Sequence, residues 1–228
     1  MKRGDWLWAL IFTAASLSLA WPGGSDQLMA LAGAHRYGVG FLAFALLGPL
    51  GDTLAGRLSG QDYPRLAALL TSALMWGLLG LAAALLFWVI NGGVVMAQTV
   101  GWLPGGGFVF SGHPLKKMLT SFFFTEPFFS SLLVNLIWPE FMAALRLGES
   151  CVNLRLAGGR WPGLARSLEA VDWAAFLRVE VATRTLVRVP LLTAVFMLPQ
   201  DLWLALAAWL GAALTGLSAL ATRPGKIA

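Results

Sequence analysis

Six long apolar stretches divide the chain, and each is bounded by glycine, proline or charged residues. An α-helix rises about 1.5 Å per residue, so about 20 apolar residues cross a hydrocarbon layer about 30 Å thick. The two clearest stretches, 66–90 and 202–221, contain no charged residue. The pattern predicts an all-α, polytopic transmembrane helix bundle with about six spans: 6–21, 37–56, 66–91, 120–145, 174–198 and 202–222.

The composition supports a membrane protein and excludes a water-soluble globule. Of 228 residues, 58% are hydrophobic and only 12% are charged, whereas soluble domains carry about 25% charged residues. The net charge of +5 comes from basic residues scattered between apolar stretches, which do not form the continuous stripe of a nucleic-acid site. The expected partner is therefore the lipid bilayer and not nucleic acid. Cys151 is the single cysteine, which excludes an internal disulfide.

The basic residues also predict an orientation. With six spans and the N-terminus inside, the inner side collects ten Lys and Arg residues and the outer side three. Lys and Arg accumulate in cytoplasmic loops, so both termini should be cytoplasmic. The N-terminus lacks the composition of a transit peptide, and a bacterial inner (cytoplasmic) membrane is the default location.

The first apolar stretch allows two interpretations. Residues 6–21 follow Lys2 and Arg3, which is also the outline of a cleaved secretory signal sequence. Tryptophans at both ends of the stretch, however, suit a span anchored at two membrane interfaces, and we favour a retained helix. Cleavage would leave five spans and would leave the inner loops unchanged.

The whole chain, 1–228, is expected to form one transmembrane domain with two long loops. The outer loop, 91–117, contains the glycine-rich run 105–107. The inner loop, 146–172, has Leu164, Leu168 and Val171 at helical spacing among charged residues. This inner loop is predicted to contain an amphipathic helix that lies along the membrane interface.

Ionisable residues inside the predicted spans are the main candidates for function. Each costs roughly 2.5 to 3.5 kcal/mol on insertion scales, so such residues face protein or water and pair with one another. Glu180, Arg184 and Arg188 follow at i, i+4 steps and share one helix face. We expect a polar seam between helices that contains Asp52, Glu126, Asn135, Glu140, Glu180, Arg184 and Arg188.

The polar seam has two interpretations, which the residues leave open. Its ion pairs could only lock the helices together. Alternatively, Arg184 and Arg188 could line a pathway for an anionic solute, because the planar guanidinium group suits carboxylate and phosphate partners.

The last apolar stretch carries small residues at helical spacing. Its main row consists of Ala207, Gly211, Thr215 and Ala219. Small residues allow two membrane helices to approach closely. We expect this row to mediate helix packing, either within the bundle or in self-association or binding of another membrane protein.

Signatures of catalysis are scarce. His35 and His113 are the only histidines, and neither lies in a zinc-binding spacing; no phosphate-binding loop or nucleophile elbow is present. We expect no catalytic residues, metal or cofactor, and hence no enzyme. An enzyme acting on a lipid or quinone, suggested only by the aromatic content and the amphipathic loop, is the weakest hypothesis.

Three motifs resemble those of a known membrane-protein family. They are the run 47–54 (Leu-Gly-Pro-Leu-Gly-Asp-Thr-Leu) with Asp62 and Arg65 behind it, Lys116-Lys117 leading to Pro127-Phe128, and Pro190 to Pro199 followed by Trp209. In this order they resemble motifs of the Mpv/PMP family of small peroxisomal and mitochondrial inner-membrane proteins, over roughly residues 40–222. The resemblance implies a compact α-helical membrane protein that forms a pore.

The chain also departs from that family's pattern. Val189-Pro190 and Thr193 stand where the family has Trp-Pro with Gln and Asn, and Trp76-Gly77 is the nearest remnant of its second-helix motif. Together, the residues and the resemblance predict a small-solute or anion channel or carrier with a charged intramembrane seam. The alternative is a structural or assembly protein whose buried ion pairs only stabilise the bundle.

Overall fold

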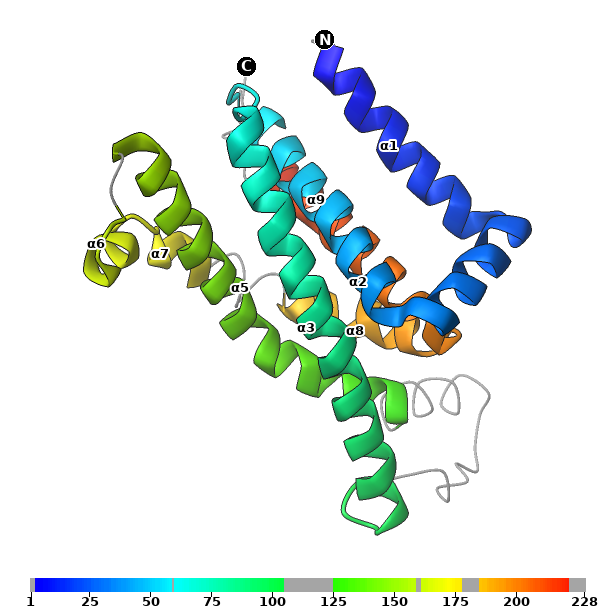
Figure 1. Cartoon of the computed structure of the whole chain (residues 1–228). Helices are drawn as coiled ribbons and strands as arrows, with labels where there is room; N and C mark the ends of the chain where they lie inside the picture. The colour runs from blue at the N-terminus through cyan, green and yellow to red at the C-terminus, as the bar shows by residue number, and fades with distance from the viewer. Residues whose placement is uncertain (1–2, 59, 105–124, 159–160, 178–184, 222–228) are drawn as a thin grey trace, which may run out of the picture.

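The computed structural model describes residues 3–58, 60–104, 125–158, 161–177 and 185–221, and all regular structure within these ranges is helical (Figure 1). This confirms the predicted all-α class. The elements are α1 (Arg3–Ala20), α2 (Pro22–Leu58), α3 (Leu66–Thr99), α5 (Glu126–Gly158), α6 (Leu164–Glu169), α7 (Trp173–Phe176), α8 (Thr185–Phe196), the 3₁₀ turn η2 (Gln200–Leu202) and α9 (Trp203–Ala221).

Four helical segments are long and apolar enough to cross a membrane. They are Gly23–Leu58, Leu66–Thr99, Glu126–Gly158 and Gln200–Ala219. Two further apolar helices, Trp8–Ala20 and Leu186–Phe196, are shorter. The described residues therefore contain four candidate spans, fewer than the six that the hydropathy pattern predicts.

Several helices extend beyond the predicted spans. α2 begins at Pro22 rather than at residue 37 and contains a kink at His35, whose backbone is non-helical (φ −138°, ψ 53°). α3 continues to Thr99, so the predicted outer loop starts as helix. α5 begins at Glu126 and continues to Gly158, which places the first part of the predicted inner loop on a membrane-length helix. Hydropathy locates the apolar centre of a helix, whereas polar residues can prolong it beyond the lipid.

The structure describes only part of two other predicted features, the span 174–198 and the interfacial loop. The predicted span 174–198 is represented by α7 and α8, and residues 178–184 lie outside the described residues. In the predicted interfacial loop, α6 is only six residues long, with Leu164 and Leu168 exposed.

α2 is the central helix of the bundle. It packs against α1, α3 and α9, while α3 also packs against α5, and α5 against α8 (Figure 1). Glycines permit the closest approaches: a Cβ atom on Gly80 would lie 2.2 Å from the carbonyl oxygen of Gly40. The start of α1 and the end of α9 lie at the same end of the bundle, because Trp8 bonds to Leu50 and Gly216 packs on Leu54.

Candidate functional site

Two polar networks join α3 to α5 at opposite ends of their apolar interface. At one end Ser72 donates a hydrogen bond to Glu149, and at the other Asn91 donates to Glu126. Ser72 and Asn91 are 19 positions apart on α3, which corresponds to about 28 Å of helix. This distance matches the hydrocarbon thickness of about 30 Å. The two networks thus define the two ends of a membrane-sized bundle.

An ion cluster forms the first network. The guanidinium group of Arg146 on α5 contacts both carboxylate oxygens of Asp52 on α2, at 2.9 and 3.3 Å. It also contacts Glu149, one turn further along α5, at 2.8 Å. The indole N–H of Trp76 on α3 donates to Asp52 at 3.0 Å. Arg146 and Asp52 therefore connect three helices, and each charge in this cluster has a partner.

The local sequence of α2 places Asp52 in this cluster. Gly48 faces the ring of Trp76 so closely that a Cβ atom would lie 2.2 Å from a ring carbon. Gly51 lies against α9, where its Cβ atom would be 2.8 Å from the Cα of Ala212. The two glycines allow α3 and α9 to pack on α2 next to Asp52. The Gly-Pro-x-Gly-Asp sequence is thus explained by packing around one carboxylate.

The ion cluster lines an open polar hollow, here called the vestibule. Its volume is about 320 Å³, which is within the range of small-molecule sites. The lining residues come from the end of α2, the connection from α2 to α3, the start of α3 and the last third of α5: Pro49, Asp52, Thr53, Gly56, Gln61, Asp62, Pro64, Ala68, Leu69, Thr71, Ser72, Arg146, Glu149 and Asn153.

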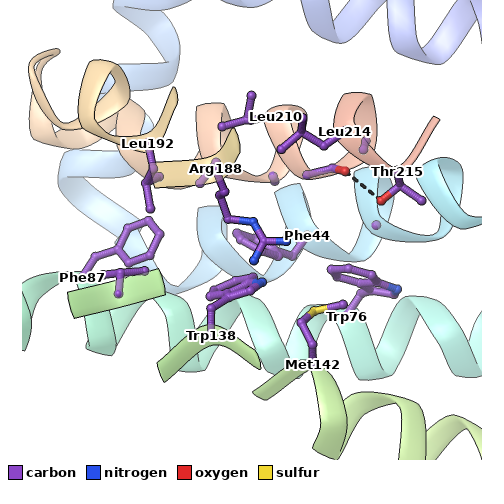
Figure 2. Close-up of a pocket in the computed structure, with 16 residues that line it drawn as sticks. Phe44, Trp76, Phe87, Trp138, Met142, Arg188, Leu192, Leu210, Leu214 and Thr215 are labelled. Atoms are coloured by element: carbon purple, nitrogen blue, oxygen red, sulfur yellow. Dashed lines mark hydrogen bonds between the residues drawn. The ribbon is translucent and has the colours of Figure 1, made fainter. Parts of the chain in front are cut away.

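A second, smaller hollow lies deeper in the bundle and is here called the central cavity. Its volume is about 40 Å³, enough for two or three water molecules at roughly 10 to 15 Å³ each. Aromatic side chains and α9 enclose it, and Arg188 of α8 points its guanidinium group into it (Figure 2). The guanidinium carbon lies 5.9 Å from the centre of the Trp138 ring, an arrangement that permits a cation–π interaction.

Arg188 lies near the middle of the bundle's membrane depth. Its neighbour Trp138 is eight residues from Ser130 in one polar network and eight from Arg146 in the other, or about 12 Å of helix from each. A charged group at this depth is expensive and commonly belongs to a functional pathway. Arg188 is therefore the strongest candidate among the described site residues.

Trp76 links the linings of the two hollows. Its ring lines the central cavity, while its N–H group bonds to Asp52, which lines the vestibule. Gly48 lines the central cavity and Pro49 lines the vestibule, so the hollows are adjacent along α2. The polar vestibule therefore lies next to the central cavity, whose lining is mainly apolar apart from Arg188 and Thr215.

Asn135 is also buried in the bundle. Its side-chain nitrogen donates to the carbonyl of Ser131, and its side-chain oxygen is buried without a hydrogen-bond partner. Ser131 in turn donates to the carbonyl of Val189, next to Arg188. Buried acceptors usually have a donor, so Asn135 adds an available oxygen to the polar interior.

The structure brings together only part of the predicted seam. Asp52, Asn135 and Arg188 face the interior, but Glu126 lies in the network at the opposite end of the bundle from Asp52. Glu180 and Arg184 lie outside the described residues.

The prediction that Glu140 joins the seam is wrong. Glu140 is exposed on α5, whereas Trp138 and Met142 face the core. A residue two positions from an inward-facing residue is rotated by about 200° around a helix and therefore points away.

Arg146, Glu149 and Trp76 are the site residues that the sequence analysis missed. Arg146 and Glu149 had been assigned to a loop because the apolar stretch ends at residue 145. Their i, i+3 spacing of opposite charges is the signal of a continuing helix.

The small residues of α9 divide between packing and the cavity. Thr215 and Ala219 are buried, as helix packing requires. Ala207, Gly211 and Thr215 line the central cavity, and a Cβ atom on Gly211 would meet no atom within 4 Å. Gly211 therefore makes no close helix contact within the bundle, and packing of this row against another chain stays a prediction.

No metal site is evident among the described residues, since no three His, Cys, Asp or Glu side chains come close enough to hold an ion. No protein-family model, curated protein or solved structure matches the chain. The geometry of the vestibule, Trp76 and the central cavity is thus the basis for a functional proposal.

Proposed function

We propose that the chain is a membrane channel or carrier for small anions. The observation that supports it is the position of Arg188, a cationic side chain at mid-depth in a cavity aligned with the vestibule. A fixed positive charge offsets the cost of bringing an anion into a medium of low dielectric constant. The vestibule provides the entrance from one end of the bundle, and Arg188 provides the binding point beyond Trp76.

The size of the cavity limits the solute. A volume of about 40 Å³ suits a monatomic anion or a few waters, and a larger solute requires the helices to move apart. Pro190 is on α8, the helix that carries Arg188, and Gly211 of α9 lines the same cavity. Proline removes a backbone hydrogen bond and weakens the helix locally, so α8 is the element best suited to such movement.

Efflux from proteoliposomes tests this function. The purified protein is reconstituted with internal chloride, and chloride release is followed with an ion-selective electrode, with potassium release measured in parallel. We expect chloride release above that of protein-free liposomes, strongly reduced by Arg188→Gln. Arg166→Gln, which changes an exposed arginine on α6, is the matched control and should release chloride like the parent.

Two results would contradict the anion proposal. One is the absence of chloride release from a correctly folded parent protein. The other is equal release by the parent and Arg188→Gln, which would separate transport from the central cavity.

A structural or assembly role is the second candidate, and the ion cluster favours it. Arg146 with Asp52 and Glu149 forms a closed set of contacts across helices, as expected of charges that only hold a bundle together. Under this function the protein would release no anion, and cross-linking in native membranes would capture a second copy or another membrane protein.

The membrane topology belongs to the same proposal. We place six crossings, the four long helices plus the segments containing α1 and α8, with both termini in the cytoplasm of a bacterium and the bundle in its inner membrane. The shared end of α1 and α9 supports an even number of crossings. Fusions of a fluorescent and a periplasmic reporter to each terminus test it: fluorescence at both termini is expected, and periplasmic activity at either would contradict it.

The resemblance to the Mpv/PMP family fits this proposal, since that family implies a compact pore-forming helical protein. Its Gly-Asp motif falls on Gly51, which packs on α9, and on Asp52, which bonds to Trp76 and Arg146. We propose no enzymatic activity, metal or cofactor.

A further inference from the structure

Trp76 connects the two hollows through one hydrogen bond. It is almost fully buried and lines the central cavity, and its N–H group is bonded to a carboxylate that lines the vestibule. Its ring lies flat enough against Gly48 that no Cβ atom could be accommodated there. The edge of the ring is therefore held by the hydrogen bond to Asp52. One part of the ring packs closely on Gly48, which has no side chain.

We infer that Trp76 is the gate between the vestibule and the central cavity, closed when its indole N–H binds Asp52. This inference rests on the proposed function, because a gate has meaning only if the cavity receives a solute. In this inference, rotation of the Trp76 side chain connects the two hollows, which lie next to each other along α2 at Gly48 and Pro49. Trp76 is thus a positioning residue that controls passage without binding the anion.

Asp52 couples this gate to the ion cluster. Its Oδ2 atom accepts from both Trp76 and Arg146, and its Oδ1 atom accepts from Arg146. A hydrogen bond to a charged group is among the stronger ones, so the closed position is favoured while Asp52 remains paired with Arg146.

Cysteine reactivity measures the gate without requiring transport. In a Cys151→Ser background, Ala68→Cys places a thiol in the vestibule, and Ala208→Cys places one in the central cavity. Each protein, in lipid nanodiscs, reacts with hydrogen peroxide, which is small enough for the central cavity of about 40 Å³, and the rate of thiol oxidation is read by mass spectrometry. With Trp76 present, the thiol at 68 should react much faster than the thiol at 208.

Opening the gate should change only the inner thiol. Trp76→Phe removes the N–H donor and should raise the rate at position 208 about tenfold, the effect expected from losing one hydrogen bond to a carboxylate. Trp76→Ala should raise it further, and both should leave position 68 unchanged. Trp88→Ala, on the same helix but over Arg36 near the opposite end, should change neither rate.

Either of two results would overturn the gate. The thiol at 208 could react as fast as that at 68 with Trp76 in place, or its rate could stay the same in Trp76→Phe with normal gel-filtration and thermal-unfolding profiles. If Trp76→Ala does not fold, the reaction rate at position 208 in Trp76→Phe is the test of the gate. A Trp76-dependent rate without chloride efflux would overturn the proposed function and leave the gate standing, whereas efflux with a Trp76-independent rate would overturn only the gate.

Discussion

Arg146 and Arg188 are both arginines inside the same helix bundle, but their surroundings differ. Arg146 lies at the end of the bundle between two carboxylates, with contacts of 2.8 to 3.3 Å. Arg188 lies at mid-depth over the ring of Trp138 and borders a cavity lined mainly by aromatic and aliphatic side chains. Arg146 binds carboxylates of the protein itself, and the guanidinium group of Arg188 points into the central cavity (Figure 2), where we propose that an anion binds.

This difference separates stability from function. A charge pair that is broken leaves the remaining charges without compensation, which destabilises the fold. A charge that faces a cavity contributes mainly to what the cavity can bind. The comparison predicts that variants of Arg146 change folding and that variants of Arg188 change anion passage.

The largest effect is expected from Arg146→Leu. It leaves Asp52 and Glu149 close together with no cation between them, and breaking a paired buried charge costs about 3 to 5 kcal/mol. We expect a value near the lower end, because the Arg146 side chain is 30% exposed. Thermal unfolding in detergent and the yield of folded protein measure this loss.

Arg155→Leu on the same helix is the control for that substitution. Arg155 lies over the exposed Trp161 ring, and an exposed cation–π contact is worth only about 0.5 to 1 kcal/mol. Equal stability of the two variants would show that the ion cluster does not hold the bundle together.

Replacing each arginine by lysine sharpens the comparison. Lysine keeps the charge but loses the planar fork that contacts both oxygens of Asp52, so Arg146→Lys should cost about 1 to 2 kcal/mol. Arg188→Lys keeps a positive charge at the cavity and should retain most of the chloride efflux. Thermal unfolding and chloride efflux, measured on both variants, check these expectations. If Arg188→Lys lost as much efflux as Arg188→Gln, the geometry of the side chain, and not its charge, would matter at this position.

The smallest effect on stability is expected from Gly211→Ala. The added methyl group meets no atom within 4 Å, and alanine in a helix is more stable than glycine by roughly 0.5 to 1 kcal/mol. The same methyl group narrows the central cavity, so chloride efflux should fall although the protein becomes slightly more stable. Gly92→Ala, in open space on α3, is the matched control and should leave efflux unchanged. Unchanged efflux in Gly211→Ala would place the route elsewhere.

Much of the fold follows from the sequence, because the spacing of apolar residues and the rarity of charges determine a helical membrane bundle. The same spacing rule could have excluded Glu140 from the interior, since it lies two residues from the core positions Trp138 and Met142. The run from Gly48 to Asp52 indicates an important position, but the sequence does not show which side chains contact Asp52. The contact of Trp76 with Asp52 depends on how α2 and α3 cross, which the order of residues does not specify.

The site was predictable in its chemistry and less so in its location. Charged groups inside spans were expected to gather, and Asp52 and Arg188 both lie in the interior. Arg146 became part of the site only because α5 continues as a helix past the apolar stretch to Gly158. A prediction from hydropathy alone ends a span where polar residues begin, so it leaves out the charged residues that line an entrance.

The central claim is that water and small anions reach the middle of this bundle, and hydroxyl-radical footprinting in nanodiscs tests it most directly. Trp138 and Trp203 form a matched pair: both are buried, but only Trp138 lines the central cavity. Radicals form from water, so Trp138 should be oxidised clearly faster than Trp203, as quantified by mass spectrometry. Equal protection of the two tryptophans would contradict a water-accessible route to Arg188.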